Sequence, residues 1–130
     1  MRTYDITLQD GTEVALRITI GSQMKLSKKY NEAAMATVFS AVADPAKICD
    51  VLTEALNYKG NENKFQTGAE LYDALVDDGY EGTEAFMELL AGIAKESGLI
   101  TDKQADQLVK YTKEQTSDLF EDEDEDPKNK

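Results

Sequence analysis

The first twenty residues alternate between apolar and polar positions, which is typical of strands with one buried face. The apolar positions are Tyr4, Ile6, Leu8, Val14, Leu16, Ile18 and Ile20. A break at residues 9–11 predicts a β-hairpin over residues 3–20 with a three-residue loop, in which Gly11 takes the left-handed conformation of a G1 bulge. This loop pairs Ile6 with Val14 and puts the apolar side chains on one face.

After the hairpin, apolar positions recur at helical spacing, and start signals divide them into about five helices. Three helix starts are marked by Asp44-Pro45, by Thr67 with Glu70, and by Thr101 with Gln104. The first is an N-cap followed by proline, and the other two fit the capping box. We therefore expect an α+β protein, mostly α, in which an N-terminal β-hairpin precedes a helical bundle over residues 22–118.

Two helices and one loop have further signals. Ser22 is expected to cap the first helix, which should end near Tyr30. The apolar face of residues 84–97 is wide, so this helix is expected to be central. Residues 59–68 are polar with two glycines, which is typical of an exposed loop.

The charge of the chain limits its partners. The 130 residues carry a formal net charge of −12 at pH 7. Nucleic acids and anionic membranes both bind through Lys and Arg on the protein, so neither is an expected partner. Cys49 is the single cysteine, which leaves no disulfide within the chain and fits a reducing compartment. We find neither a signal-peptide core nor an apolar run near the ~20 residues that cross a bilayer.

Residues 1–120 are long enough for a single domain with its own core. Six consecutive acids follow them: Glu121, Asp122, Glu123, Asp124, Glu125 and Asp126. Such a run has nothing to bury, so residues 121–130 are expected to be a disordered acidic tail. Three roles are open for this tail: a solvated segment that aids solubility, a weak cation-binding strip, or a flexible arm for a basic partner.

The residue types give little support for catalysis. The chain has no histidine, and so lacks the commonest general base and metal ligand. It also has no P-loop or dinucleotide-binding glycine motif, and no carboxylate pair whose apolar setting would separate two pKa values. We expect no enzyme activity and no cofactor.

Residues 77–88 partly match the calcium-binding loop of an EF-hand. Asp77 and Glu88 fall at its first and last ligand positions, but Gly79 provides no side-chain oxygen at the third position. A helix end at Gly79 and a new helix capped by Thr83 is the simpler interpretation. A calcium sensor remains the alternative.

The order of parts resembles the tail assembly chaperones of long-tailed, siphovirus-type bacteriophages and the related proteins of gene transfer agents. The resemblance covers roughly residues 3–100, as an opening hairpin, a helix directly after it and a helical domain. The hairpin residues that carry it are Leu8, Asp10, Gly11, Leu16, Arg17, Thr19, Ile20 and Gly21. Residues 48–58 and 88–100 resemble later helices of that family.

This resemblance implies a non-catalytic scaffold of a phage or prophage, acting in the cytoplasm of the bacterial host and absent from the mature virion. It implies that several copies coat the tape measure protein, keep it soluble and recruit tail tube subunits. An amphipathic helical protein can cover the apolar stripes of such a partner. A strongly acidic coat would keep the assembly dispersed.

Candidate partner contacts lie on the hairpin and among the aromatic residues. The hairpin candidates are Thr7, Arg17 and Thr19, because a free strand edge can bind a second copy or a tube subunit. The aromatic candidates are Tyr30, Phe39 and Tyr58, which a core role explains equally well. A hairpin packed only on its own helices is the alternative to strand addition.

A different class of function also fits the charge. An acidic inhibitor that mimics DNA would present carboxylates to a DNA-binding enzyme. Against it, the acids gather in the tail, whereas the body of the chain mixes Lys with Glu. A general housekeeping adaptor is a further alternative.

Overall fold

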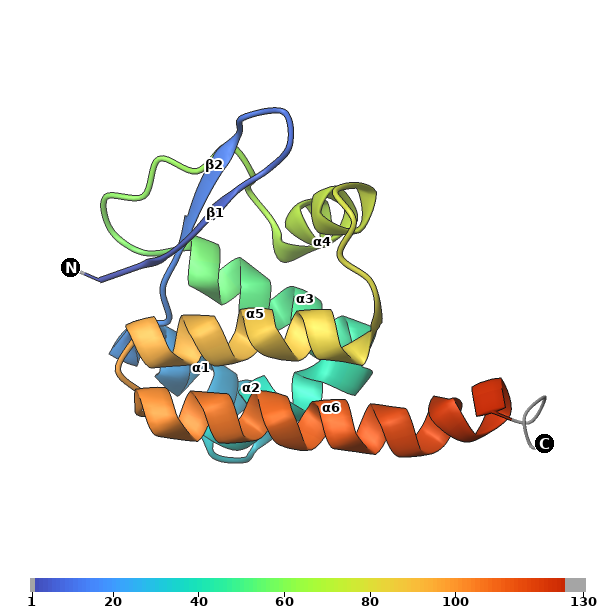
Figure 1. Cartoon of the computed structure of the whole chain (residues 1–130). Coiled ribbons are helices and arrows are strands. Elements are labelled where there is room, and N and C mark those ends of the chain that lie inside the picture. Colours follow the sequence, from blue (N-terminus) through green and yellow to red (C-terminus); the bar gives the residue numbers. More distant parts are fainter. Residues whose placement is uncertain (1, 126–130) are drawn as a thin grey trace.

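A two-stranded antiparallel hairpin precedes six α-helices in the computed structural model (Figure 1), which describes residues 2–125 and the side chains of residues 2–115. The expected α+β class, mostly α, is confirmed, with six helices where about five were expected. The helices are α1 (Ile20–Tyr30), α2 (Ala34–Ser40), α3 (Pro45–Leu56), α4 (Gly68–Asp77), α5 (Gly82–Glu96) and α6 (Asp102–Glu125), with a 3-10 turn, η1 (Ala41–Ala43), after α2.

The hairpin has the predicted register. Strands β1 (Tyr4–Thr7) and β2 (Glu13–Leu16) pair Ile6 with Val14 and Tyr4 with Leu16. The Leu8 N–H donates to Thr12 O (2.8 Å) and the Gly11 N–H donates to Leu8 O (2.9 Å). Gly11 has φ of 91°, so the three-residue loop with a G1 bulge is confirmed. The paired strands are shorter than residues 3–20.

The helix starts follow local capping rules. Asp44 accepts from the N–H groups of Ala46 and Lys47, Thr67 and Glu70 form the capping box, and Thr101 and Gln104 exchange the corresponding two bonds. Two expected caps are wrong. Thr19 rather than Ser22 caps α1, because its hydroxyl accepts from the Ser22 N–H. Glu81 stands at the N-cap of α5, and Thr83 lies inside the helix.

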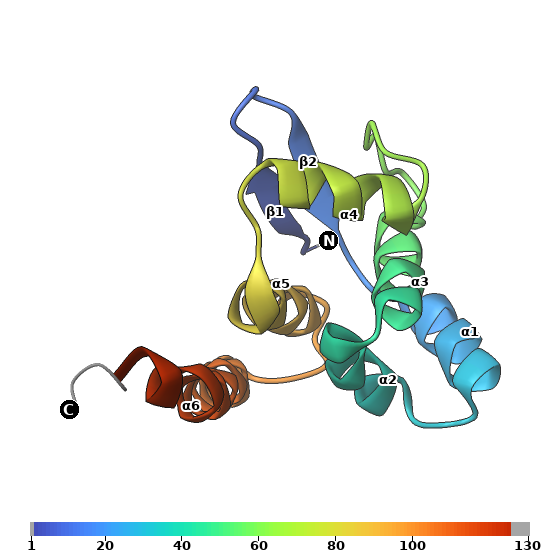
Figure 2. The same ribbon diagram turned by 90° about the vertical axis from the view of Figure 1, so that its right-hand side faces the viewer.

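Helix α5 lies at the centre of the fold, as expected. Its apolar side is almost wholly buried and contacts two clusters, one toward the hairpin and α3, the other toward α6. Figures 1 and 2 show the hairpin on one side of α5 and α6 on the other. The hairpin packs closely against α5: a Cβ on Gly92 of α5 would lie 2.2 Å from Cε1 of Tyr4.

Helix α6 is longer than the sequence predicted. It continues through Glu125, past the expected end of the helical region at residue 118. The expected disorder of residues 121–130 is therefore corrected for residues 121–125, and residues 126–130 lie outside the described part of the chain. The reason is that Asp and Glu do not break a helix.

Candidate functional site

The hairpin has an inner face in the core and an outer face that is open. The inner face carries the buried side chains of Ile6, Leu8, Val14 and Leu16. The outer face carries Asp5, Thr7, Glu13 and Ala15, whose side chains alternate with these along the strands. A sheet of two strands also has two edges. The outer face and these edges are therefore the parts of the hairpin that remain available for contacts outside the core.

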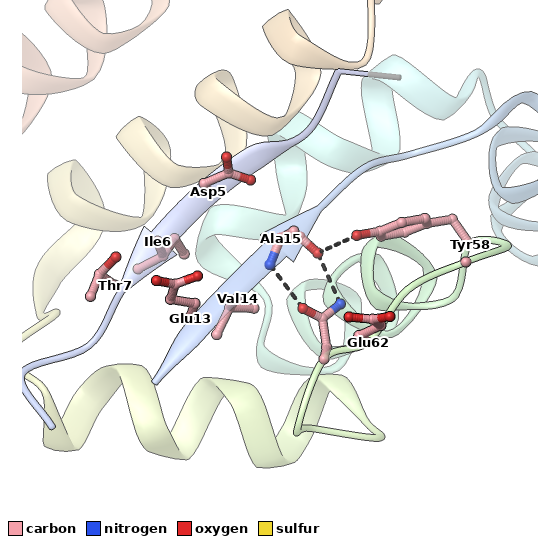
Figure 3. A pocket seen from close by; sticks show the side chains of 10 residues that line it. Asp5, Ile6, Thr7, Glu13, Val14, Ala15, Tyr58 and Glu62 are labelled. Carbon is pink, nitrogen blue, oxygen red and sulfur yellow. Dashed lines mark hydrogen bonds between the residues drawn. The ribbon is translucent and has the colours of Figure 1, made fainter. Parts of the chain in front are cut away.

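The edge of β2 is closed by residues of the α3–α4 loop (Figure 3). The Asn63 side chain accepts from the Ala15 N–H (2.8 Å) and donates to Ala15 O (2.9 Å), and the Tyr58 hydroxyl also donates to Ala15 O (3.2 Å). One amide side chain thus replaces a neighbouring strand. The backbone N–H of Asn63 in turn donates to Asn61 Oδ1 (3.0 Å). This bond fixes the position of Asn63 within the loop.

The edge of β1 is open over Asp5 and Thr7. In an antiparallel pair, successive residues point their N–H and C=O groups alternately at the partner strand and away from it. Ala15, which pairs with Asp5, points its groups outward to Asn63, so the backbone groups of Asp5 and Thr7 also point outward. Within the described residues they have no hydrogen-bond partner, and both residues are exposed.

The open stretch of β1 ends at Gln9. There Asp78, beyond α4, accepts from the Gln9 N–H through Oδ1 (2.9 Å), and its backbone oxygen accepts from Gln9 Nε2 (3.0 Å). The described sheet has two strands, so no further strand of the described chain pairs with the outer edge of β1. The free length of edge is therefore short, about two residues.

The outer face of the hairpin and the α3–α4 loop enclose an acidic cleft of about 600 Å³. Asp5, Glu13 and Glu62 contribute carboxylates, and no Lys or Arg is among the residues that line it. Figure 3 shows that these side chains come from both strands and from the loop. The pKa of Tyr58 is raised, first by burial and also by the Asp5 charge, against the effect of the Asn63 hydrogen bond. The cleft therefore favours positive charge.

Two of the predicted contact residues meet in this cleft, and two others do not. Thr7 and Tyr58 both line it. Arg17 lies elsewhere, since its guanidinium donates to Arg2 O (2.8 Å). Thr19 is no strand-edge residue, because it caps α1.

The remaining predicted residues are also outside the cleft. Tyr30 and Phe39 are half-buried and pack against the core, as the alternative interpretation had it. The Tyr30 hydroxyl donates to Asp50, which raises the pKa of Tyr30 to about 12. The side chains of Glu121, Asp122, Glu123, Asp124, Glu125 and Asp126 are outside the described side chains.

Sequence reasoning missed the two residues that decide which edge is open. Asn63 and Asp78 are polar residues of a loop and a helix end, and nothing in their local pattern connects them with the hairpin. They bind it across 48 and 69 positions of sequence, respectively.

The segment considered for calcium is mostly helical. Asp77 is the last residue of α4 and α5 begins at Gly82, while Gly79 has φ of 104°, which confirms the predicted helix end there. Within the described part of the chain, no group of three or more metal-binding side chains is placed to hold an ion. None of the helices that the structure describes is long and apolar enough to cross a membrane.

Comparison with known proteins identifies no relative: no protein family, curated protein or solved structure matches the chain.

Proposed function

We propose that this chain is a tail assembly chaperone of a long-tailed phage or prophage. In this role it is a non-catalytic protein of the bacterial cytoplasm that binds the tape measure protein, keeps it soluble, helps to recruit tail tube subunits and is absent from the mature virion. The proposal rests on the order of parts described above and on one observation: the hairpin has one closed edge and one open edge, the open one beside an acidic cleft.

An open strand edge supports a binding role. Folded proteins usually cover such edges, because the exposed N–H and C=O groups pair readily with another chain. Here Asn63 and Tyr58 cover β2, while the described residues leave Asp5 and Thr7 of β1 uncovered. An extended segment of a partner can add to β1 through main-chain hydrogen bonds. Lys or Arg on that segment would face the carboxylates of the cleft.

Co-expression with a long, coiled-coil-like tape measure protein tests the proposal. We expect that protein to be insoluble alone and to be recovered in the soluble fraction by a tag on this chain. An unchanged insoluble fraction would overturn the chaperone function.

A proline variant tests the edge separately. Thr7→Pro removes an N–H that points away from β2, so recovery of the partner should fall, whereas Thr7→Val keeps the N–H and should bind as the parent does. Circular dichroism establishes that both variants are folded. If Thr7→Pro is folded and binds as well as Thr7→Val, the partner does not use this edge.

The acidic cleft by itself favours a second candidate, an acidic inhibitor that mimics DNA. Three carboxylates gathered on one surface are a property of such proteins, and they would bind the DNA site of an enzyme in place of phosphates. Competition between this protein and duplex DNA for a nuclease or repair enzyme distinguishes the candidates. The tail chaperone should leave DNA binding unchanged.

A further inference from the structure

Helix α1 has an outer face with the opposite charge to the rest of the protein. Its eleven residues include Lys25, Lys28 and Lys29 and no acid, in a chain whose net charge is −12. Two large apolar side chains lie beside these lysines: Ile20 is 70% exposed and Met24 is 66% exposed. At i, i+4 spacing these two form one stripe. The face therefore combines an apolar stripe with a basic one.

The body of the protein does not use this face. The opposite side of α1 is the one that packs, with Ser22 and Leu26 buried. Lys29 pairs with Asp50 (2.8 Å), but among the described side chains Lys25 and Lys28 make no ion pair. Exposure of two large apolar residues next to unpaired cations is a pattern expected of a surface that a partner covers.

The end of the chain has the complementary pattern. Leu119 and Phe120 are followed directly by six acids, residues 121–126. On α1 the apolar residues likewise precede the lysines, so a segment lying parallel to α1 would place apolar on apolar and acid on base. We propose that α1 binds residues 119–126 of a second copy of this chain.

The geometry of α6 makes the contact intermolecular. At 1.5 Å per residue, the 24 residues of α6 span about 36 Å. Both views place α1 and the C-terminal end of α6 on opposite sides of the molecule (Figures 1 and 2). Of the six acids, five lie within α6 and one, Asp126, follows it. The acidic segment therefore cannot reach α1 of its own copy while α6 remains helical.

A contact between two different surfaces has a consequence for assembly. When the tail of each copy binds α1 of the next, the interface is head-to-tail, and it gives rings or open chains rather than closed two-fold dimers. The contact uses this chain alone, so it goes beyond the proposed function and stands or falls independently of it. If both hold, such chains would extend along a long partner.

Sedimentation of the full chain tests the contact. We expect association that rises with protein concentration at about 0.05 M salt and weakens at about 0.5 M salt, because exposed ion pairs are screened. Lys25→Glu with Lys28→Glu should weaken association by about tenfold or more. Reversal of Glu121, Asp122, Glu123 and Asp124 to Lys should do the same.

Mixing the two variants gives the sharpest test. The α1 variant keeps an acidic tail, the tail variant keeps a basic α1, and the two reversed surfaces also complement each other, so the mixture should associate although neither variant does so alone. A chain with both sets of reversals should associate again. The matched control is Lys59→Glu with Lys103→Glu, which changes two exposed lysines away from α1 by the same charge and should associate as the parent does.

Three results would overturn the proposal. The parent chain could remain monomeric at low salt, the α1 variant could associate as tightly as the parent, or the control could weaken association as much as the α1 variant. The last result would assign the effect to net charge. Circular dichroism of each variant excludes unfolding, and none of these measurements involves a tape measure protein.

Discussion

The hairpin and α1 follow one another in the chain and pack on the same core, yet their outer faces differ in charge. The hairpin presents Asp5 and Glu13, with Glu62 of the neighbouring loop, whereas α1 presents Lys25 and Lys28. Their inner faces both pack on the core: the hairpin buries apolar side chains, and α1 buries Leu26 and Ser22, whose hydroxyl donates to Glu54 O (3.3 Å). Packing on the core thus accounts for the inner side of each element. The two outer sides differ from each other in charge.

The comparison separates residues that hold the fold from residues available to partners. Substitutions on the inner sides should change the free energy of unfolding. Substitutions on the outer sides should leave it nearly unchanged and alter association.

The largest effect is expected on the inner side of the hairpin. In Gly92→Ala the new methyl group would lie 2.2 Å from Cε1 and 2.7 Å from Cδ1 of Tyr4, so the ring or α5 must move. We expect a loss of about 2 kcal/mol in the free energy of unfolding, measured by urea denaturation. Tyr4→Leu in the same background should recover part of the loss. A parent-like midpoint for Gly92→Ala would contradict the close packing of β1 on α5.

The next effect concerns the closed edge of β2. Asn63→Ala removes both side-chain bonds to Ala15 and should cost about 1.5 kcal/mol. It also opens a second strand edge, so light scattering on heating should increase. Glu62→Ala is the control, because this exposed neighbour lines the cleft without bonding to β2. Equal losses in the two variants would mean that Asn63 does not close the edge.

A smaller effect of opposite sign is expected on the outer side of α1. Gly21 lies in the helix, and the nearest atom to an added Cβ is Thr19 Oγ1 at 3.8 Å. Gly21→Ala should therefore stabilise the protein by about 0.5–1 kcal/mol, because alanine favours the helix. Thermal denaturation measures the shift. Destabilisation would show that this side of α1 is less open than described.

The smallest effect is a pH dependence on the inner side of α1. The hydrogen bond to Asp50, aided by burial, raises the pKa of Tyr30 to about 12, from about 10 in an unfolded chain. The folded protein therefore holds this proton more tightly, so the contribution is present below pH ~10 and is lost as pH rises toward ~12. Unfolding of the parent and of Tyr30→Phe across this range should give curves that converge. Parallel curves would contradict the raised pKa.

Local rules predicted the backbone of this protein well. Alternation and the loop 9–11 gave the hairpin register, and the capping boxes at Thr67 and Thr101 marked two helix starts. These features depend on neighbouring residues only. The two wrong caps, Ser22 and Thr83, arose where a second capping residue, Thr19, stands three positions earlier and where Glu81 takes the N-cap position without a side-chain bond.

The candidate site was predictable only in part. Thr7 and Tyr58 were identified as possible contacts and do line one cleft, but their proximity depends on a loop that returns to the hairpin. Arg17 and Thr19 share the hairpin's sequence pattern, yet the chain has already left the sheet at these positions.

The sequence by itself determined the alternation of the hairpin, the helix starts and the separation of charge into acidic and basic segments, because short-range sterics and solvation act within a few residues. Only the tertiary structure decided that β2 is closed by Asn63, that β1 stays open and that Tyr4 requires Gly92. Each of these depends on backbone or side-chain groups far apart in the chain meeting at hydrogen-bond or van der Waals distance. Such meetings follow from the packing of whole elements, which no local pattern encodes.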